Sequence, residues 1–187
     1  LILTDPVMGD DGEVYPIYTE GLRSRFRELV SRSYVITPNL TEALLLLYGK
    51  EEMEKKWKVL ETMPEAERLE KIQEIGQCLV LEFSLSAVVI TGVNYRENSQ
   101  TPKMGNLVLE KEKVSWVFAE KSGGSYSGTG DLFASVLSAG LVKGYSMETC
   151  AHMAVEFIST SIRDAVSEGT DRNDGVCFEA HLGMLLS

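Results

Sequence analysis

The chain has 187 residues and a formal net charge of −10, with 18 Lys and Arg against 28 Asp and Glu. Hydrophobic residues make up 44% and charged residues 25%, which excludes a disordered chain, a collagen-like chain and a disulfide mini-protein. The acidic balance argues against a protein that binds nucleic acid through its overall field. Cys78, Cys150 and Cys177 form no metal-ligand or disulfide pattern, so we expect a cytoplasmic protein.

Residues 1–4 (Leu-Ile-Leu-Thr) predict a buried strand. The sequence starts within this strand and not with Met. We therefore expect the chain to be the C-terminal part of a longer protein. No stretch has the roughly 18 consecutive apolar residues of a membrane helix, so we expect no membrane partner.

The pattern along the first half of the chain alternates between strands and helices. Thr19 and Asn39 are suited to cap helices, and Gly49 to end one. The predicted elements are a strand at 1–4, a loop at 8–16, a helix at 20–32, a strand at 34–37, a helix from Asn39 to Tyr48, a charged surface segment at 50–63, a helix opened by Pro64 and reaching Phe83, and a strand at 87–91.

The second half continues this pattern. Its predicted elements are a polar loop at 93–105, an antiparallel pair at 107–110 and 114–119 around 111–113, a Gly- and Ser-rich loop at 121–130, and helices at 132–142, 146–166 and 176–186. Strands that alternate with helices predict an α/β fold with a mostly parallel sheet flanked by helices. We expect one domain over residues 1–187.

In open α/β sheets, ligands bind at the carboxyl ends of the strands. Four unusual clusters follow the predicted strands, at residues 5–12, 37–42, 91–92 and 123–131. The cluster at 123–131 gives the most specific functional signal. A Gly-rich loop at a helix start exposes backbone N–H groups that form an anion hole for a phosphoryl group. Asp131 either accepts the proton of a substrate hydroxyl there or is the N-cap of the helix.

The other clusters also have two interpretations. Asn39 and Glu42 have the spacing of a capping box, and Glu42 is also placed to hold a water on Mg²⁺. Asp5 is either a turn residue before Pro6 or a metal ligand. Asp10 is a solvated loop residue or lies on the phosphate or metal side of a site, and Tyr15 anchors a loop or covers a ligand.

Together and in this order, the four clusters resemble the ribokinase-like superfamily, and within it the pyridoxal kinases. The matching segments are residues 5–10 (Asp-Pro-Val-Met-Gly-Asp), 37–42 (Thr-Pro-Asn-x-x-Glu), 88–92 (Val-Val-Ile-Thr-Gly) and 128–131 (Gly-Thr-Gly-Asp). The resemblance implies transfer of the γ-phosphoryl group of ATP to the 5′-hydroxymethyl group of a B6 vitamer. It also implies Mg²⁺, a possible response to K⁺, a homodimer, and an N-terminal half that is missing from this chain.

The resemblance also implies a functional role for each residue that matches the family's motifs. Asp131 would be the catalytic base, and Gly128, Thr129 and Gly130 the anion hole. Asp5 and Glu42 would lie on the metal side, with Tyr15 and Asp10 in the region that covers the substrate. Thr37, Asn39, Thr91 and Gly92 would contact ATP.

Three alternatives stay open. The first is a hydroxymethylpyrimidine (phosphate) kinase of thiamine synthesis, whose anion-hole motif usually ends in Cys where this chain has Asp131. The second is a sugar kinase of the same superfamily, against which the segment at 5–10 and Tyr15 argue. The third is a non-catalytic nucleotide-binding fragment, against which the intact residues 128–131 and Glu42 argue.

Overall fold

The computed structural model describes residues 1–95, 102–111 and 113–186. Its helices are α1 (Glu20–Val30), α2 (Leu40–Tyr48), α3 (Lys50–Thr62), α4 (Glu65–Phe83), α5 (Thr129–Val142), α6 (Met147–Glu168) and the 3₁₀ helix η1 (Glu179–Leu185). Its strands are β1 (Leu3–Thr4), β2 (Gly9–Asp10), β3 (Glu13–Val14), β4 (Val35–Ile36), β5 (Ala87–Tyr95), β6 (Lys103–Glu110) and β7 (Lys113–Glu120).

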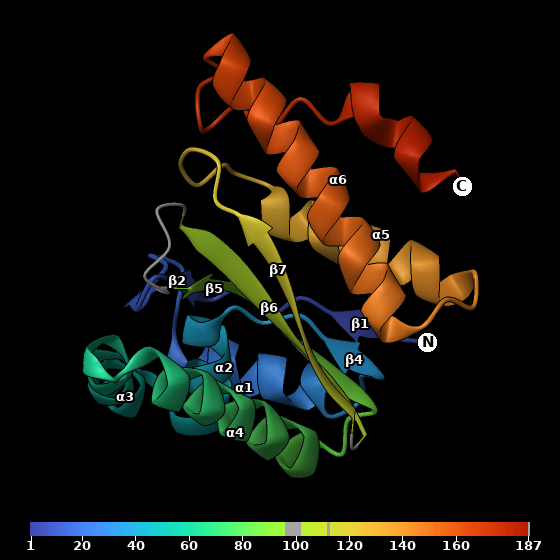
Figure 1. Ribbon diagram of the computed structural model, residues 1–187. Helices are drawn as coiled ribbons and strands as arrows, with labels where there is room; N and C mark the ends of the chain where they lie inside the picture. Colours follow the sequence, from blue (N-terminus) through green and yellow to red (C-terminus); the bar gives the residue numbers. More distant parts are fainter. Residues whose placement is uncertain (96–101, 112, 187) are drawn as a thin grey trace. The chain divides into compact units, whose positions relative to one another are not determined.

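Five strands form one sheet in the order β1-β4-β5-β6-β7 (Figure 1). β1 pairs with β4 in parallel, and β4 pairs with β5 in parallel. β6 and β7 are neighbours separated by two residues, a connection that is long enough only for an antiparallel hairpin. The sheet is therefore mixed, with a parallel part and helices packed against it, which confirms the predicted α/β class.

The chain divides into two compact units. Unit 1 comprises Leu1–Val93 and Asn106–Ser115, and unit 2 comprises Asn94–Gly105 and Trp116–Ser187. β6 and β7 each contribute residues to both units. The single domain over 1–187 stays a prediction, and each unit is described below by itself.

The core of unit 1 lies between α4 and the middle of the sheet. Gly76 faces the strands, where a Cβ on it would overlap Leu109 Cδ1 and lie 3.3 Å from Leu107 Cδ2. Ile90 Cδ1 lies 3.6 Å from the same position. The glycine thus lets the helix approach β5 and β6 closely, and all three strand side chains are fully buried or nearly so.

In unit 2, α5 packs against α6 by a similar close approach. Gly140 of α5 faces Cys150 of α6, whose Sγ would lie 2.6 Å from a Cβ on the glycine. Cys150, Ala151 and Ala154 are fully buried on the α6 side. Of the helices in the described ranges, none is long and apolar enough to cross a membrane.

The structure corrects two of the expected loops. The segment at 8–16 is not a plain loop, because Asp11 and Gly12 both have positive φ and form a tight turn between β2 and β3. The predicted loop at 93–105 is shorter, since β5 extends to Tyr95 and β6 begins at Lys103. Of this loop, residues 96–101 lie outside the described residues, as does Glu112 of the predicted connection.

We expect Gly76→Ala to lower the free energy of unfolding by about 1–3 kcal/mol, because the added methyl overpacks a buried contact with Leu109. Gly21→Ala in α1 is the matched control, since its Cβ would meet only Thr19 Oγ1, at 3.7 Å. The control should stabilise the chain by up to about 1 kcal/mol through helix propensity. Urea unfolding measures both, and equal stabilisation by the two changes would contradict the packing described here.

Candidate active site

The first group of candidate residues lies at the carboxyl ends of the parallel strands of unit 1. β1 and β4 run in register, and beyond them Thr37 N–H donates to the Thr4 carbonyl at 3.1 Å. The buried Thr37 hydroxyl then donates to Asp5 Oδ1 at 2.8 Å. The pairing of the two strands thus places the Asp5 carboxylate beside Thr37, as the strand-end argument predicted.

Asn39 and Glu42 form the capping box of α2, so the structural interpretation of this pair is confirmed. Glu42 N–H donates to Asn39 Oδ1 and Asn39 N–H donates to Glu42 Oε2, both at 2.9 Å. The pair also reaches the loop that follows β1. Met8 N–H donates to Glu42 Oε1 at 3.0 Å, and Asn39 Nδ2 donates to the Gly9 carbonyl at 2.8 Å.

Electrostatics link the carboxylates of this group. Burial raises the pKa of Glu42 to about 8. The hydrogen bonds from the N–H groups of Asn39 and Met8 lower this pKa, and the nearby Asp5 raises it. Burial also raises the pKa of Tyr15, with added contributions from Asp10, Glu42 and Asp5. The Tyr15 phenol therefore lies within electrostatic range of all three carboxylates.

The donors of this group fit a magnesium ion that is held mainly by substrate phosphates. Mg²⁺ prefers oxygen ligands, keeps several waters and is often bound through only one or two carboxylates. Asp5 and Glu42 supply such oxygens, and both Glu42 oxygens already accept backbone N–H groups, which favours contact through water. Within the described ranges, no three His, Cys, Asp or Glu side chains gather into a metal-ligand group.

Thr91 and Gly92 lie inside β5 and not at its end, which corrects the expected strand boundary. Thr91 is bridged to Asn39, and its N–H donates to the Pro38 carbonyl at 2.9 Å. Gly92 has a φ of 69°, and its N–H donates to Asn106 Oδ1 at 3.3 Å. Glycine adopts this left-handed φ readily, and the strand continues beyond it to Tyr95.

The second group lies in unit 2, where the Gly-rich loop meets α5. Gly128 is the N-cap with a φ of 80°, so Asp131 is the third helical residue, and its interpretation as the N-cap is wrong. The N–H groups of Thr129, Gly130 and Asp131 have no acceptor among the described residues, as expected for a first helical turn. Asp131 is exposed beside them. The geometry is that of an anion hole with a carboxylate at its edge.

Hydrogen bonds fix the loop before α5. Ser127 N–H donates to the Arg172 carbonyl at 2.9 Å, and the Thr129 hydroxyl donates to the Tyr126 carbonyl at 3.1 Å. Arg172 lies in the segment that follows α6, so this segment supports the Gly-rich loop from within unit 2.

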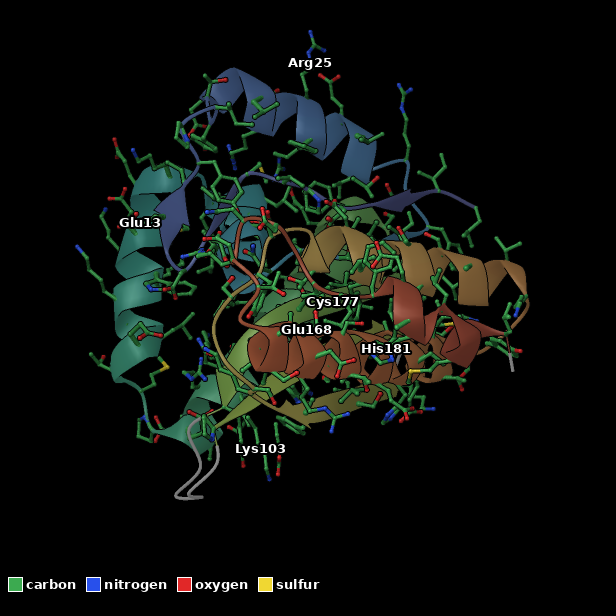
Figure 2. All side chains as sticks on the ribbon, turned by 90° about the horizontal axis from the view of Figure 1, so that it is seen from above. Glu13, Arg25, Lys103, Glu168, Cys177 and His181 are labelled. Carbon is green, nitrogen blue, oxygen red and sulfur yellow. The ribbon has the colours of Figure 1, made fainter. Side chains whose placement is uncertain are left out.

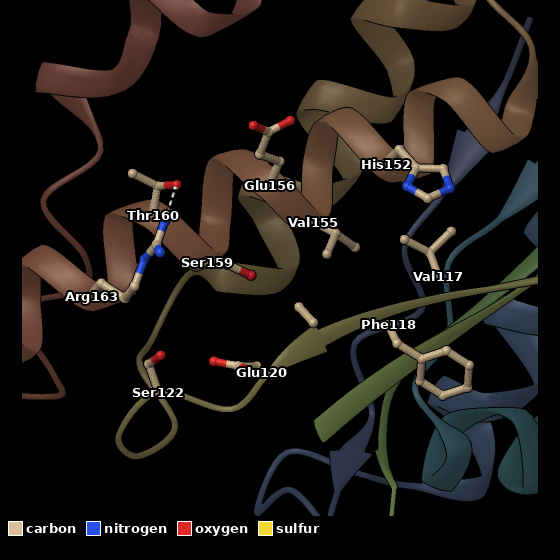
Figure 3. A pocket seen from close by; sticks show the side chains of 11 residues that line it. Val117, Phe118, Glu120, Ser122, His152, Val155, Glu156, Ser159, Thr160 and Arg163 are labelled. Carbon is tan, nitrogen blue, oxygen red and sulfur yellow. Dashed lines mark hydrogen bonds between the residues drawn. The ribbon is translucent and has the colours of Figure 1, made fainter. Parts of the chain in front are cut away.

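A cavity of about 380 Å³ lies elsewhere in unit 2, between β7 and α6 (Figure 3). It contains none of the residues predicted from the sequence. Its polar lining includes Glu120, Glu156 and Arg163, and Arg163 Nη2 donates to Thr160 Oγ1 at 2.9 Å.

Sequence reasoning missed three residues that shape the first group. Thr41 is buried and its Oγ1 accepts from Gly12 N–H at 2.9 Å. Trp57 lies against Gly12, and Asn106 Oδ1 accepts from Gly92 N–H. Of these three, only Thr41 could have been found from the sequence, since it lies within the segment 37–42. The partners of Trp57 and Asn106 are set by the tertiary fold.

The chain matches the phosphomethylpyrimidine kinase family over residues 1–175 and belongs to that family. It is 29% identical over 168 residues to the pyridoxine kinase of Bacillus subtilis, an alignment that covers 88% of this chain. The crystal structure of the pyridoxal kinase of Lactobacillus plantarum matches with a TM-score of 0.79 and 26% identity over 100% of this chain. A Bacteroides thetaiotaomicron protein crystallised with pyridoxal matches with a TM-score of 0.81 and 28% identity, also over 100% of this chain.

The chain spans only part of these relatives. It covers 54% of the Bacillus subtilis enzyme and 61% of each of the two solved structures. The likeness therefore supports the fold of the part described here.

We expect the free energy of unfolding to fall as the pH rises from about 4.5 to 8 in metal-free buffer. Over this range the unfolded chain has lost the Glu42 proton, whereas the folded chain keeps it because burial raises the pKa of Glu42 to about 8. The slope should approach about 1.4 kcal/mol per pH unit. Urea unfolding at a series of pH values measures it.

Glu42→Gln should remove this part of the pH dependence, because the side chain no longer titrates. It should also lower stability throughout, since one of the two backbone N–H groups loses its acceptor. Glu51→Gln on the exposed surface of α3 is the matched control. If the free energy of unfolding of Glu42→Gln fell with pH as steeply as that of the unchanged chain, a group other than Glu42 would be titrating.

Proposed function

We propose that the protein containing this chain transfers the γ-phosphoryl group of ATP to the 5′-hydroxymethyl group of a vitamin B6 compound. The likeness to the pyridoxine kinase of Bacillus subtilis and to the pyridoxal kinase of Lactobacillus plantarum supports this substrate class. The observation that carries the proposal is the start of α5, where Asp131 stands beside three backbone N–H groups that lack acceptors in the described ranges.

In this proposal the first turn of α5 stabilises the phosphoryl group during transfer. The N–H groups of Thr129, Gly130 and Asp131 would donate to its oxygens, and the helix dipole adds positive potential at the same point. Gly128 makes this approach possible, because its φ of 80° is costly for other residues and a Cβ there would meet no atom within 4 Å. The open space in front of Gly128 is suited to an anion.

Asp131 would orient the acceptor hydroxyl and take its proton. As the hydroxyl oxygen forms its bond to the γ-phosphorus, the bond from that phosphorus to the bridging oxygen of ADP breaks. The proton of the hydroxyl passes to the Asp131 carboxylate. The exposed position of Asp131 leaves it accessible to the acceptor.

The residues of unit 1 would act on the nucleotide side. Asp5 and Glu42 would hold Mg²⁺, mainly through water, and the ion would neutralise charge on the phosphates when bound. Thr37, Asn39, Thr91 and Gly92 would contact ATP or the water shell of the ion. Tyr15 and Asp10, on the segment around the β2–β3 turn, would cover the substrate. A response to K⁺ and a homodimer remain part of the same proposal.

A second candidate is phosphorylation of hydroxymethylpyrimidine or its phosphate. The family match over residues 1–175 favours it, because that family is described by the pyrimidine activity. The two candidates share the proposed phosphoryl-transfer site and differ in the acceptor. ADP release from Mg-ATP by the full-length protein, measured in parallel with pyridoxal and with hydroxymethylpyrimidine, separates them.

We expect Asp131→Asn to lower kcat by about 10²–10⁴-fold, because the amide cannot accept the proton of the hydroxyl. Binding of Mg-ATP should stay within a few fold, since the backbone N–H groups are unchanged. Steady-state kinetics and titration calorimetry with a non-hydrolysable ATP analogue measure the two effects. Preserved turnover with a large loss of ATP affinity would contradict the assigned role.

A further inference from the structure

The turn between β2 and β3 has the geometry of a tight hairpin. Asp11 and Gly12 have φ of 49° and 81°, and Asp-Gly is a favoured pair for this two-residue turn. Gly9 pairs with Val14 and Asp10 with Glu13 on its two sides. We call residues 9–14 the hairpin. Asp10 is part of it, and Tyr15 follows directly, with its N–H bonded to the Met8 carbonyl at 2.9 Å.

The turn of the hairpin lies against a tryptophan of α3. A Cβ built on Gly12 would lie 2.5, 2.6 and 2.7 Å from Nε1, Cδ1 and Cε2 of Trp57, so the five-membered ring of the indole covers the glycine backbone. In Figure 2 the strand that carries Glu13 lies beside α3, in agreement with this contact. Gly12 thus supplies both the positive φ of the turn and the room for the ring.

Trp57 belongs to the inner face of α3. Met53 and Leu60, four residues before it and three after it, are buried in the core of unit 1. Trp57 itself is only partly buried, because its ring extends from this face toward the hairpin. The helix that holds the ring is therefore fixed by the core, whereas the hairpin is partly exposed, at Asp10, Asp11 and Glu13.

The hairpin is held from two sides. The start of α2 holds it by polar contacts, since Thr41 Oγ1 accepts from Gly12 N–H and Asn39 Nδ2 donates to the Gly9 carbonyl. α3 adds the indole of Trp57 on the turn. The polar contacts join the hairpin to the start of α2, and the ring packs against the turn from the side of α3.

We propose that Trp57 is a positioning residue, which by holding the turn at Gly12 sets the place of Asp10 in the hairpin and of Tyr15 directly after it. This inference rests on the proposed function for its catalytic consequence. The anchoring itself rests only on contacts within unit 1. Trp57 would touch neither substrate nor metal and would act through the hairpin.

The anchoring is tested by hydrogen exchange of the full-length protein, measured by mass spectrometry on peptides that cover residues 8–16. We expect Trp57→Ala to speed the exchange of the Gly12 and Tyr15 amides by about tenfold, because the turn then opens locally more often. Trp57→Phe should restore most of the protection. Val59→Ala, on the exposed side of the same helix, is the matched control and should leave these peptides unchanged.

The positioning role is tested by kinetics of the same variants. Trp57→Ala should lower kcat by about tenfold, with a smaller change in the KM for ATP, because a displaced hairpin no longer holds Asp10 and Tyr15 over the bound acceptor and the acceptor is then less well oriented. Trp57→Phe should return kcat to within about twofold of the wild-type value.

Three outcomes would overturn the inference. Unchanged exchange in residues 8–16 of Trp57→Ala would show that the ring does not hold the hairpin. Equally faster exchange in peptides from α2 and α4 would show a general structural role. Faster local exchange with unchanged kcat would remove the positioning role. Absence of turnover in the wild-type protein with every acceptor would instead contradict the proposed function, and exchange would still decide the anchoring.

Discussion

The candidate site of unit 1 depends on one buried carboxyl group. Glu42 is the only acidic residue in the described ranges that is buried, and both of its oxygens accept backbone N–H groups. A buried carboxyl group is costly unless it is hydrogen-bonded, so these N–H groups must stay in place. One of them belongs to the cap of α2 and the other to the loop after β1. The side chain therefore joins the loop after β1 to the start of α2, where Asn39 is bonded to it and Asp5 lies within electrostatic range.

The parts of this arrangement that could be predicted from the sequence are local. The three-residue spacing of Asn39 and Glu42 predicts the capping box, and the pattern of strands and helices predicts the α/β class. The hydrogen bond from Met8 to Glu42 joins residues 34 positions apart and leaves no such pattern. The same holds for Trp57 on Gly12 and for Asn106 at Gly92, whose partners are set by packing.

One prediction and one of the two interpretations of Asp131 failed for local reasons that the sequence did contain. The Asp-Gly pair at 11–12 is a recognised hairpin signal, yet the many polar residues around it suggest a plain loop. Asp131 is a favoured N-cap residue, but the preceding Gly128 adopts the left-handed conformation and takes that place. Asp131 is thereby moved into the first turn, where its side chain is not used in capping. In both cases a glycine with positive φ decided the structure.

The contact between Gly140 and Cys150 also has a chemical consequence. Of the three cysteines, Cys78 is exposed, and Cys177 is half-buried near its hydrogen-bonding partners Glu168 and Thr170 (Figure 2). Cys150 is fully buried where α6 meets Gly140 of α5. An alkylating reagent must therefore wait for these two helices to separate before it reaches the Cys150 thiol. The rate at which the Cys150 thiol is labelled therefore reports how often α5 and α6 separate within unit 2.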